Sequence, residues 1–311
     1  MVLIKKTLSL ILTLLLFSFA AFMAFQVIPG DSVTAMLGTE ATQEQIDAMR
    51  EQLGLDQPIL TRYKNWITGF IRGDLGTSYG YKMPVAQILK EKIPVTMALS
   101  VLAFAITLLV SFPLGILYAK YVGTPANTFF VMLNQVVMSI PPFFSGILFS
   151  TIFGVIFKFF TPGNFVSYSQ DPWGFWRYLL FPALAIAMPK TAMTIRMLRS
   201  SILTEMNKDY VRTAYSRGNT KVRTLNVHVL SNALIPVITF LAMTFSGIVA
   251  GSIIIEQIFV IPGIGRLLLS ISSRDYPMVL AIVMLIAAIV ILMNYFSDVL
   301  CKFIDPRTRR S

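Results

Sequence analysis

Long runs without a charged residue constrain this chain more than any other feature. A helix needs about 20 consecutive apolar residues to cross the hydrocarbon core of a bilayer. Because lipid offers the backbone no hydrogen-bond partners, such runs form helices. We therefore expect an all-α, polytopic membrane protein with six transmembrane helices. Five charge-free runs cover 7–28, 93–119, 121–157, 229–255 and 276–297, and a sixth candidate, about 178–198, is interrupted by Lys190.

The run 121–157 is long for one crossing, yet it is too short for two crossings and a turn. Pro141 and Pro142 lie near its middle. Proline lacks a backbone donor and clashes with the preceding helical turn. We therefore expect one long helix that is kinked at this pair.

The charge distribution predicts the orientation of the helices. Only 13% of the residues are charged, yet the formal net charge is +11. If both termini are cytoplasmic, the inner segments hold almost all of this excess, as the positive-inside rule requires. This distribution explains the net positive charge, so we expect no nucleic-acid partner.

The first apolar run follows Lys5 and Lys6 and is longer than the core of a signal peptide, about 7–15 residues, so we expect a retained helix.

Residues 1–92 form the first expected domain, namely the first transmembrane helix and an extracytoplasmic segment. Thr42 and Gln45 have the spacing of a capping box at a helix start. After Pro58, an apolar stripe that includes Tyr63 and Trp66 predicts a second amphipathic helix at the water–lipid boundary. This segment either caps the helix bundle or contacts an external partner.

The chain lacks the groups that most enzymes need. It has no G-x-x-x-x-G-K-[S/T] phosphate loop, and its single cysteine, Cys301, and single histidine, His228, form no metal cluster. Lys190 is the one candidate for a charge deep in a span, and its long stem can reach toward the cytoplasm. We expect neither an enzyme nor an ion-coupled carrier, so a transporter of this kind would take its energy from another subunit.

The most informative loop, at about 200–232, lies within the second expected domain, 93–311. Tyr210, Val211 and Ala214 recur at helical spacing, Gly218 signals a stop, and Thr220 can cap a second helix. Arginines flank the small-residue face of the first helix, which is typical of a helix that lies in a groove of a soluble protein. The alternative is a basic loop that only obeys the positive-inside rule.

This loop resembles the coupling loop of permease subunits in bacterial ABC importers. In the dipeptide, oligopeptide and nickel branch the pattern is D-Y-[V/I]-R-T-A-x-x-x-G, followed by H-x-L-x-N-A-x-x-P. Ser231 stands where the general family pattern has proline. The matching residues are Asp209, Tyr210, Arg212, Thr213, Ala214, Gly218, His228, Leu230, Asn232, Ala233 and Pro236. Further resemblance lies at Leu53–Pro58, Gly73–Ser78, Pro94–Thr96, Glu256–Phe259, Pro262–Arg266, Arg274–Pro277 and Asp305–Arg307.

The resemblance implies a MetI-like permease fold and the first-permease, or B-type, role in a bacterial plasma membrane. A second homologous permease, two ATP-binding subunits and an extracytoplasmic solute-binding protein are the implied partners, besides membrane lipid. ATP and Mg²⁺ would bind to the ATPase subunits, and this chain would hold no cofactor or metal. Residues Arg212 to Gly218 would touch an ATPase groove, whereas Tyr210 and His228 would brace the loop. The implied coupling set is Tyr210, Arg212, Thr213, Ala214, Arg217, Gly218, His228, Leu230, Asn232 and Pro236.

The sequence therefore predicts a permease subunit of an ATP-driven importer of di- or oligopeptides. An importer of nickel or of a metallophore is the alternative within this class. A secondary transporter or channel that works alone is the alternative from another class.

Overall fold

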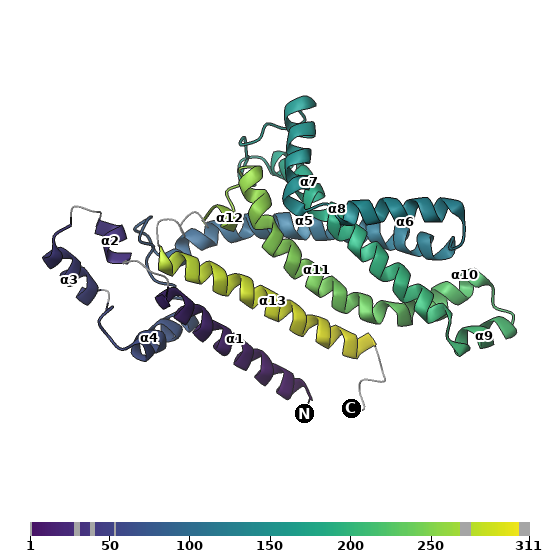
Figure 1. Cartoon of the computed structure of the whole chain (residues 1–311), viewed down its shortest axis with the longest axis horizontal. Coiled ribbons are helices and arrows are strands. Elements are labelled where there is room, and N and C mark those ends of the chain that lie inside the picture. The colour runs from purple at the N-terminus through teal and green to yellow at the C-terminus, as the bar shows by residue number, and fades with distance from the viewer. Residues whose placement is uncertain (1, 28–31, 38–40, 53, 268–274, 305–311) are drawn as a thin grey trace. The chain divides into compact units, whose positions relative to one another are not determined.

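The computed structural model describes residues 2–27, 32–37, 41–52, 54–267 and 275–304, and within these ranges the regular elements are helices (Figure 1). Leu53, Arg274 and the segment 305–307, which contribute to the family resemblance, lie outside the described residues. The helix bounds are α1 Val2–Val27, α2 Ser32–Leu37, α3 Gln43–Gln52, α4 Ile59–Ile71, α5 Val85–Lys120, α6 Pro125–Met138, α7 Pro142–Phe149, α8 Pro172–Met206, α9 Asp209–Ser216, α10 Lys221–Arg223, α11 Leu230–Ile258, α12 Ile264–Leu267 and α13 Tyr276–Ile304. Two π-helical segments complete the set, η1 Ser150–Ile156 and η2 Thr224–Val229.

Five helices within the described ranges are long and apolar enough to cross a membrane, and a sixth span is made if one bent pair is counted. The five are Lys6–Val27, Val85–Lys120, Pro172–Met206, Lys221–Ile258 and Tyr276–Cys301. The all-α, polytopic fold expected from the sequence is confirmed.

The bent pair shows that the expected kink at Pro141 and Pro142 is a break. Pro125–Met138 and Pro142–Ile156 meet at 95°, with Pro141 in an extended conformation at ψ 142°. A residue that precedes proline is pushed out of the helical region, and here that residue is itself a proline. The chain therefore leaves the helix completely and starts a new helix with Pro142 in its first turn.

The chain divides into two compact units, and the boundaries fall within α5, between α11 and α12, and within α13. The first unit comprises Met1–Val95 and Pro262–Ile291, and the second comprises Thr96–Ile261 and Leu292–Ser311. Each unit has its own buried apolar cluster, so each is described separately.

In the first unit, the expected capping box is confirmed at the start of α3. The Thr42 amide donates to Gln45 Oε1 at 3.0 Å, and the Gln45 amide donates to Thr42 Oγ1 at 3.4 Å. The following helix, α4, packs against α1 through its aromatic stripe: the Tyr63 and Ser18 hydroxyls are 2.8 Å apart, and the Trp66 ring lies 5.5 Å from that of Phe22. The amphipathic pattern thus serves contact with a transmembrane helix.

Two of the motif segments of the first unit meet at Asp275, which is completely buried. The Ser78 hydroxyl donates to Asp275 Oδ2, and the Gly80 amide donates to the same oxygen at 3.2 Å. The Met278 amide donates to Asp275 Oδ1 at 3.4 Å at the start of α13. Asp275 therefore links the loop that follows Gly73 to the start of α13.

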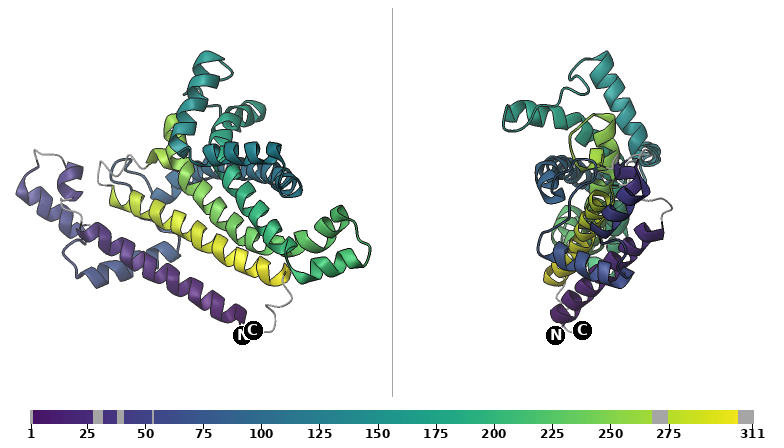
Figure 2. Two further views of the ribbon diagram at one scale, coloured as in Figure 1. Left: turned by 45° about the vertical axis from the view of Figure 1, so that its right-hand side comes forward. Right: turned by 90° about the vertical axis from the view of Figure 1, so that its left-hand side faces the viewer.

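In the second unit, α8 and α11 run side by side and form its centre (Figures 1 and 2). A buried cluster that includes Leu198 and Ile202 of α8 with Ala233 and Val237 of α11 fills the space between them. Near the other end of α11, the Thr96 hydroxyl donates to the buried Glu256 carboxylate at 2.6 Å. The loop at 200–232 joins the ends of α8 and α11 that contain this buried cluster. The packing of the two helices therefore fixes the position of the loop.

Candidate functional site

The loop between α8 and α11 folds as the sequence predicts: a helix, a break and a second helical stretch (Figure 1). The break is at Gly218, whose φ of +83° is a conformation that glycine adopts at low cost. Asn219 closes the end of α9, because its amide and its side chain each donate to the Ala214 carbonyl at 3.2 Å. Thr220 then caps the next helix by accepting from the Arg223 amide at 3.3 Å.

One face of α9 is turned into the chain itself. Val211 is 1% exposed and Ala214 is 7% exposed. Residues three apart lie on the same side of a helix, so these two share the inward face. Val211 belongs to the apolar cluster with Leu225 and Val229 of the following segment. The structure therefore places Ala214 against its own subunit, and not on the face that a groove-binding helix would offer to a partner.

The opposite face of α9 is basic and exposed, and it carries Arg212, Thr213, Tyr215, Ser216 and Arg217. Arg212 lies 4.0 Å from Asp209, but both side chains are almost fully in solvent, so this ion pair contributes little to stability. Thr213 donates to the Asp209 carbonyl at 3.3 Å, and Ser216 donates to that of Arg212 at 3.1 Å. The hydroxyls thus bond within the helix, and the arginines extend outward.

A hydrogen-bond network connects α9 to both long helices. The Tyr210 hydroxyl donates to Glu205 Oε1 of α8 at 2.9 Å and lies 3.4 Å from the His228 carbonyl oxygen. Asn232 of α11 donates to the same carbonyl at 3.1 Å and to the Tyr210 hydroxyl at 3.4 Å. Lys208 pairs with the other oxygen of Glu205 at 2.6 Å. His228 contributes its main-chain oxygen to the network, while the residue as a whole is exposed.

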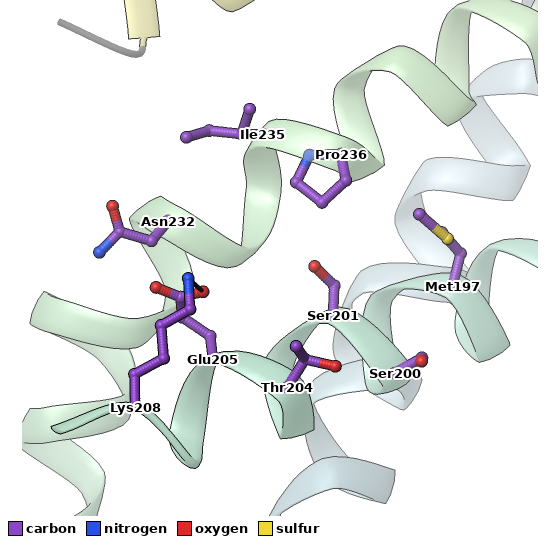
Figure 3. Close-up of a pocket in the computed structure, with 9 residues that line it drawn as sticks. All are labelled: Met197, Ser200, Ser201, Thr204, Glu205, Lys208, Asn232, Ile235 and Pro236. Carbon is purple, nitrogen blue, oxygen red and sulfur yellow. Dashed lines mark ion pairs between the residues drawn. The ribbon is translucent and has the colours of Figure 1, made fainter. Parts of the chain in front are cut away.

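A cleft of about 460 Å³ lies beside this network, between the end of α8 and the start of α11 (Figure 3). Ser201 of α8 lines the cleft and donates to the Ala233 carbonyl of α11 at 2.7 Å. Pro236 also lines the cleft and interrupts the backbone hydrogen bonds of α11. Leu230 packs against the apolar cluster of this unit. The residues that line the cleft are Met197, Ser200, Ser201, Thr204, Glu205, Lys208, Asn232, Ile235 and Pro236.

Glu205 and Lys208 are parts of the site that the sequence patterns do not single out. In the sequence Glu205 is one charged residue among several in the loop, yet its side chain is only 10% exposed, pairs with Lys208 and accepts a hydrogen bond from Tyr210. The available signal was a single acidic residue one helical turn before the D-Y pattern, at the end of an apolar span. Within the described part of the chain, no group of three His, Cys, Asp or Glu side chains is placed to hold a metal ion.

Comparison with known proteins relates nearly the whole chain to one group. Residues 111–310 match the family model described as the inner membrane component of binding-protein-dependent transport systems, and residues 1–100 match its N-terminal model. A peptide transport system permease protein of Brucella abortus is 34% identical over 98% of each chain. The oligopeptide transport system permease protein AppB of Bacillus subtilis and the glutathione transport system permease protein GsiC of Salmonella typhimurium are each 32% identical, again over 98% of each chain.

Among solved structures, the MetNI methionine ABC transporter in an inward-facing conformation shares the fold. One of its chains aligns with a TM-score of 0.56 and 15% identity, which covers 70% of this chain and 97% of that one. The likeness concerns the path of the helices, and it agrees with the permease fold expected from the sequence.

Proposed function

Because the chain belongs to the family of inner membrane components of binding-protein-dependent transport systems, we propose that it forms, with a second permease, the peptide pathway of an ATP-driven importer. The names of three relatives that match over their full length support a peptide substrate, since glutathione is itself a tripeptide. In this proposal two ATP-binding subunits supply the energy, and an extracytoplasmic binding protein delivers the peptide.

The observation that carries the coupling role is the division of α9 into two faces. The outward face presents Arg212, Tyr215 and Arg217 to solvent. The inward face is fixed by Val211 in the apolar cluster and by Tyr210 on Glu205. A helix that is anchored on one side and basic on the other can bind an acidic groove of a partner. When that groove moves, the anchored helix can transmit the displacement to α8 and α11 because it stays attached to them. We assign the outward face to contact with an ATPase subunit.

This assignment requires that the loop lie in the cytoplasm with both chain termini. The distribution of Lys and Arg supports this orientation, because the excess positive charge gathers in the segments on that side. ATP and Mg²⁺ then act entirely within the partner subunits, and this chain contributes motion and a pathway but no catalytic group.

Charge reversal on α9 tests the docking role. The double variant Arg212→Glu and Arg217→Glu in the assembled complex should weaken recruitment of the ATPase subunits about tenfold or more and lower peptide uptake in parallel, because complementary charge steers such contacts. Arg177→Glu, on the exposed surface at the other end of α8, is the matched control. Unchanged recruitment by the double variant would refute the docking role.

The substrate is tested separately in proteoliposomes that contain the complete complex. Uptake of a labelled tripeptide that depends on ATP and on the binding protein supports the proposal, whereas uptake of Ni²⁺ alone supports the nickel alternative. Transport by the purified chain without ATPase subunits would identify a stand-alone transporter or channel.

A further inference from the structure

A second cleft, of about 420 Å³, lies within the first unit, where α1 ends, α4 passes and α13 begins. Its apolar wall includes Phe22 and Phe25 of α1 and Leu280 of α13. Its polar wall is rich in hydrogen-bond donors and includes Arg50 and Arg62, with Asp56 as the one carboxylate that lines it. The lining of the cleft therefore combines apolar and basic residues.

Arg62 is the central group of the polar wall. Its side chain is half-buried and makes one long hydrogen bond, from Nη1 to the Leu55 carbonyl at 3.5 Å, and it forms no salt bridge with any described residue. Burial lowers the pKa of this guanidinium, and the neighbouring Tyr79 and Asp56 side chains act in the opposite direction. A guanidinium has five N–H donors in a planar fork that suits a phosphate group, so most of this donor capacity is available to a ligand.

Two tyrosines add neutral donors to the same wall. Burial, and then the nearby Asp275 carboxylate, raise the pKa of Tyr79, so its phenol keeps its proton. The Tyr276 hydroxyl is buried and has no hydrogen-bond partner among the described residues. A buried hydroxyl without a partner costs free energy, and an acceptor oxygen of a ligand in the cleft that Tyr276 lines would remove this cost.

The position of the cleft identifies the class of ligand. Phe22 and Phe25 lie in the last turns of the candidate span Lys6–Val27, and Tyr276 begins the candidate span Tyr276–Cys301. Trp66 of α4 also lines the cleft. Tryptophan and tyrosine at the ends of spans mark the level of the lipid headgroups. At this level the available ligand with an anionic oxygen group and an apolar body is a phospholipid.

We propose that this cleft binds one phospholipid, whose phosphate is held by Arg62 and the two tyrosines and whose acyl chains lie against Phe22, Phe25 and Leu280. Arg50 of α3 lines the same cleft, so the lipid would connect α3 and α4 of the outer segment to the ends of α1 and α13. The proposal does not depend on the identity of the transported substrate.

Lipid retention by the assembled transporter tests the proposal. After partial delipidation, native mass spectrometry counts the lipids that remain bound when phosphatidylglycerol, diacylglycerol or inorganic phosphate is added back. We expect retention of phosphatidylglycerol and not of diacylglycerol, and about tenfold or more weaker retention in Arg62→Gln, because the variant loses charged hydrogen bonds to the phosphate. Arg72→Gln is the matched control, since Arg72 is exposed at the end of α4 and does not line the cleft.

Three outcomes would overturn the proposal. Equal retention by Arg62→Gln and the unmodified protein would remove the role of the guanidinium. Equal retention of diacylglycerol would remove the role of the phosphate. Displacement of the lipid by inorganic phosphate at the concentrations at which the lipid itself binds would assign the cleft to a free anion.

A fluorescence measurement keeps the proposal testable if Arg62→Gln does not assemble. The chain has three tryptophans, and Trp173→Phe with Trp176→Phe leaves Trp66 as the single reporter in the cleft. Brominated phosphatidylglycerol should quench Trp66 in a saturable way that the unbrominated lipid reverses. Quenching that rises only in proportion to bulk lipid would contradict a bound lipid.

Discussion

The Tyr210 hydroxyl of α9 donates a hydrogen bond of 2.9 Å to the Glu205 carboxylate of α8. This contact joins the exposed loop helix to a helix of 35 residues that is long enough to cross the membrane. Because Tyr210 also meets the His228 carbonyl and Asn232, the two long helices and the loop helix are connected through a single phenol.

Removing this phenol should weaken the coupling of ATP hydrolysis to transport. Tyr210→Phe keeps the ring but leaves the part-buried Glu205 without one donor, at a cost of about 1–3 kcal/mol. We expect less peptide transported per ATP hydrolysed by the complete complex in proteoliposomes. Tyr168→Phe, at an exposed tyrosine outside this loop, is the control and should behave as the unmodified protein. Equal coupling ratios in the two variants would show that the network carries no motion.

Substitution of Gly218 should act through the backbone alone. A Cβ at this position would meet nothing within 4 Å, but φ is +83°. Gly218→Ala should therefore cost about 1–2 kcal/mol, the usual penalty for a left-handed conformation, whereas Gly218→Asn should cost less. The thermal unfolding temperatures of the detergent-purified complexes measure the relative stability of the two variants and the unmodified protein. If the Gly218→Ala variant were at least as stable as the Gly218→Asn variant, the left-handed conformation assigned to residue 218 would be contradicted.

The Thr96–Glu256 contact should contribute to stability. The hydroxyl donates at 2.6 Å to a carboxylate that is fully buried, and Thr96→Val removes that donor. Loss of a donor to a buried acceptor costs about 1–3 kcal/mol, so the unfolding temperature should fall. Thr128→Val is a suitable comparison, because Thr128 is exposed and bonds a carbonyl of its own helix. Equal unfolding temperatures of the two variants would mean that the buried Thr96–Glu256 contact contributes nothing to stability.

Close approach of α5 and α8 at Gly115 should not tolerate a side chain. A Cβ there would lie 2.8 Å from Leu198 Cδ2 and 3.2 Å from Leu198 Cβ, and Leu198 is completely buried. Gly115→Ala should destabilise the chain by about 1–3 kcal/mol through overpacking. Gly251→Ala in α11 serves as the control, because its Cβ would meet nothing within 4 Å and alanine favours a helix. A neutral Gly115→Ala would indicate that Leu198 can move aside.

Local patterns in the sequence predicted much of this fold. The apolar runs located the long helices, and the Thr42–Gln45 spacing located the start of α3. Gly218 and Thr220 located the break and restart in the 200–232 loop. These features depend on a few neighbouring residues, which is why a single sequence reveals them. The consecutive prolines predict a kink, whereas in the structure the extended Pro141 ends the helix rather than bending it.

By itself, then, the sequence determined the helical membrane class, the position of the loop and the family pattern within it. Only the tertiary structure decided which face of α9 is available, because Val211 and Ala214 are buried and Val211 belongs to a cluster with residues of α5, α8 and α11. It also decided the partners of Glu205 and the closure of Ser78 on Asp275, 197 residues apart. Periodicity tells which residues share a face of a helix, but what that face contacts depends on elements that are distant in sequence, and only packing brings them together.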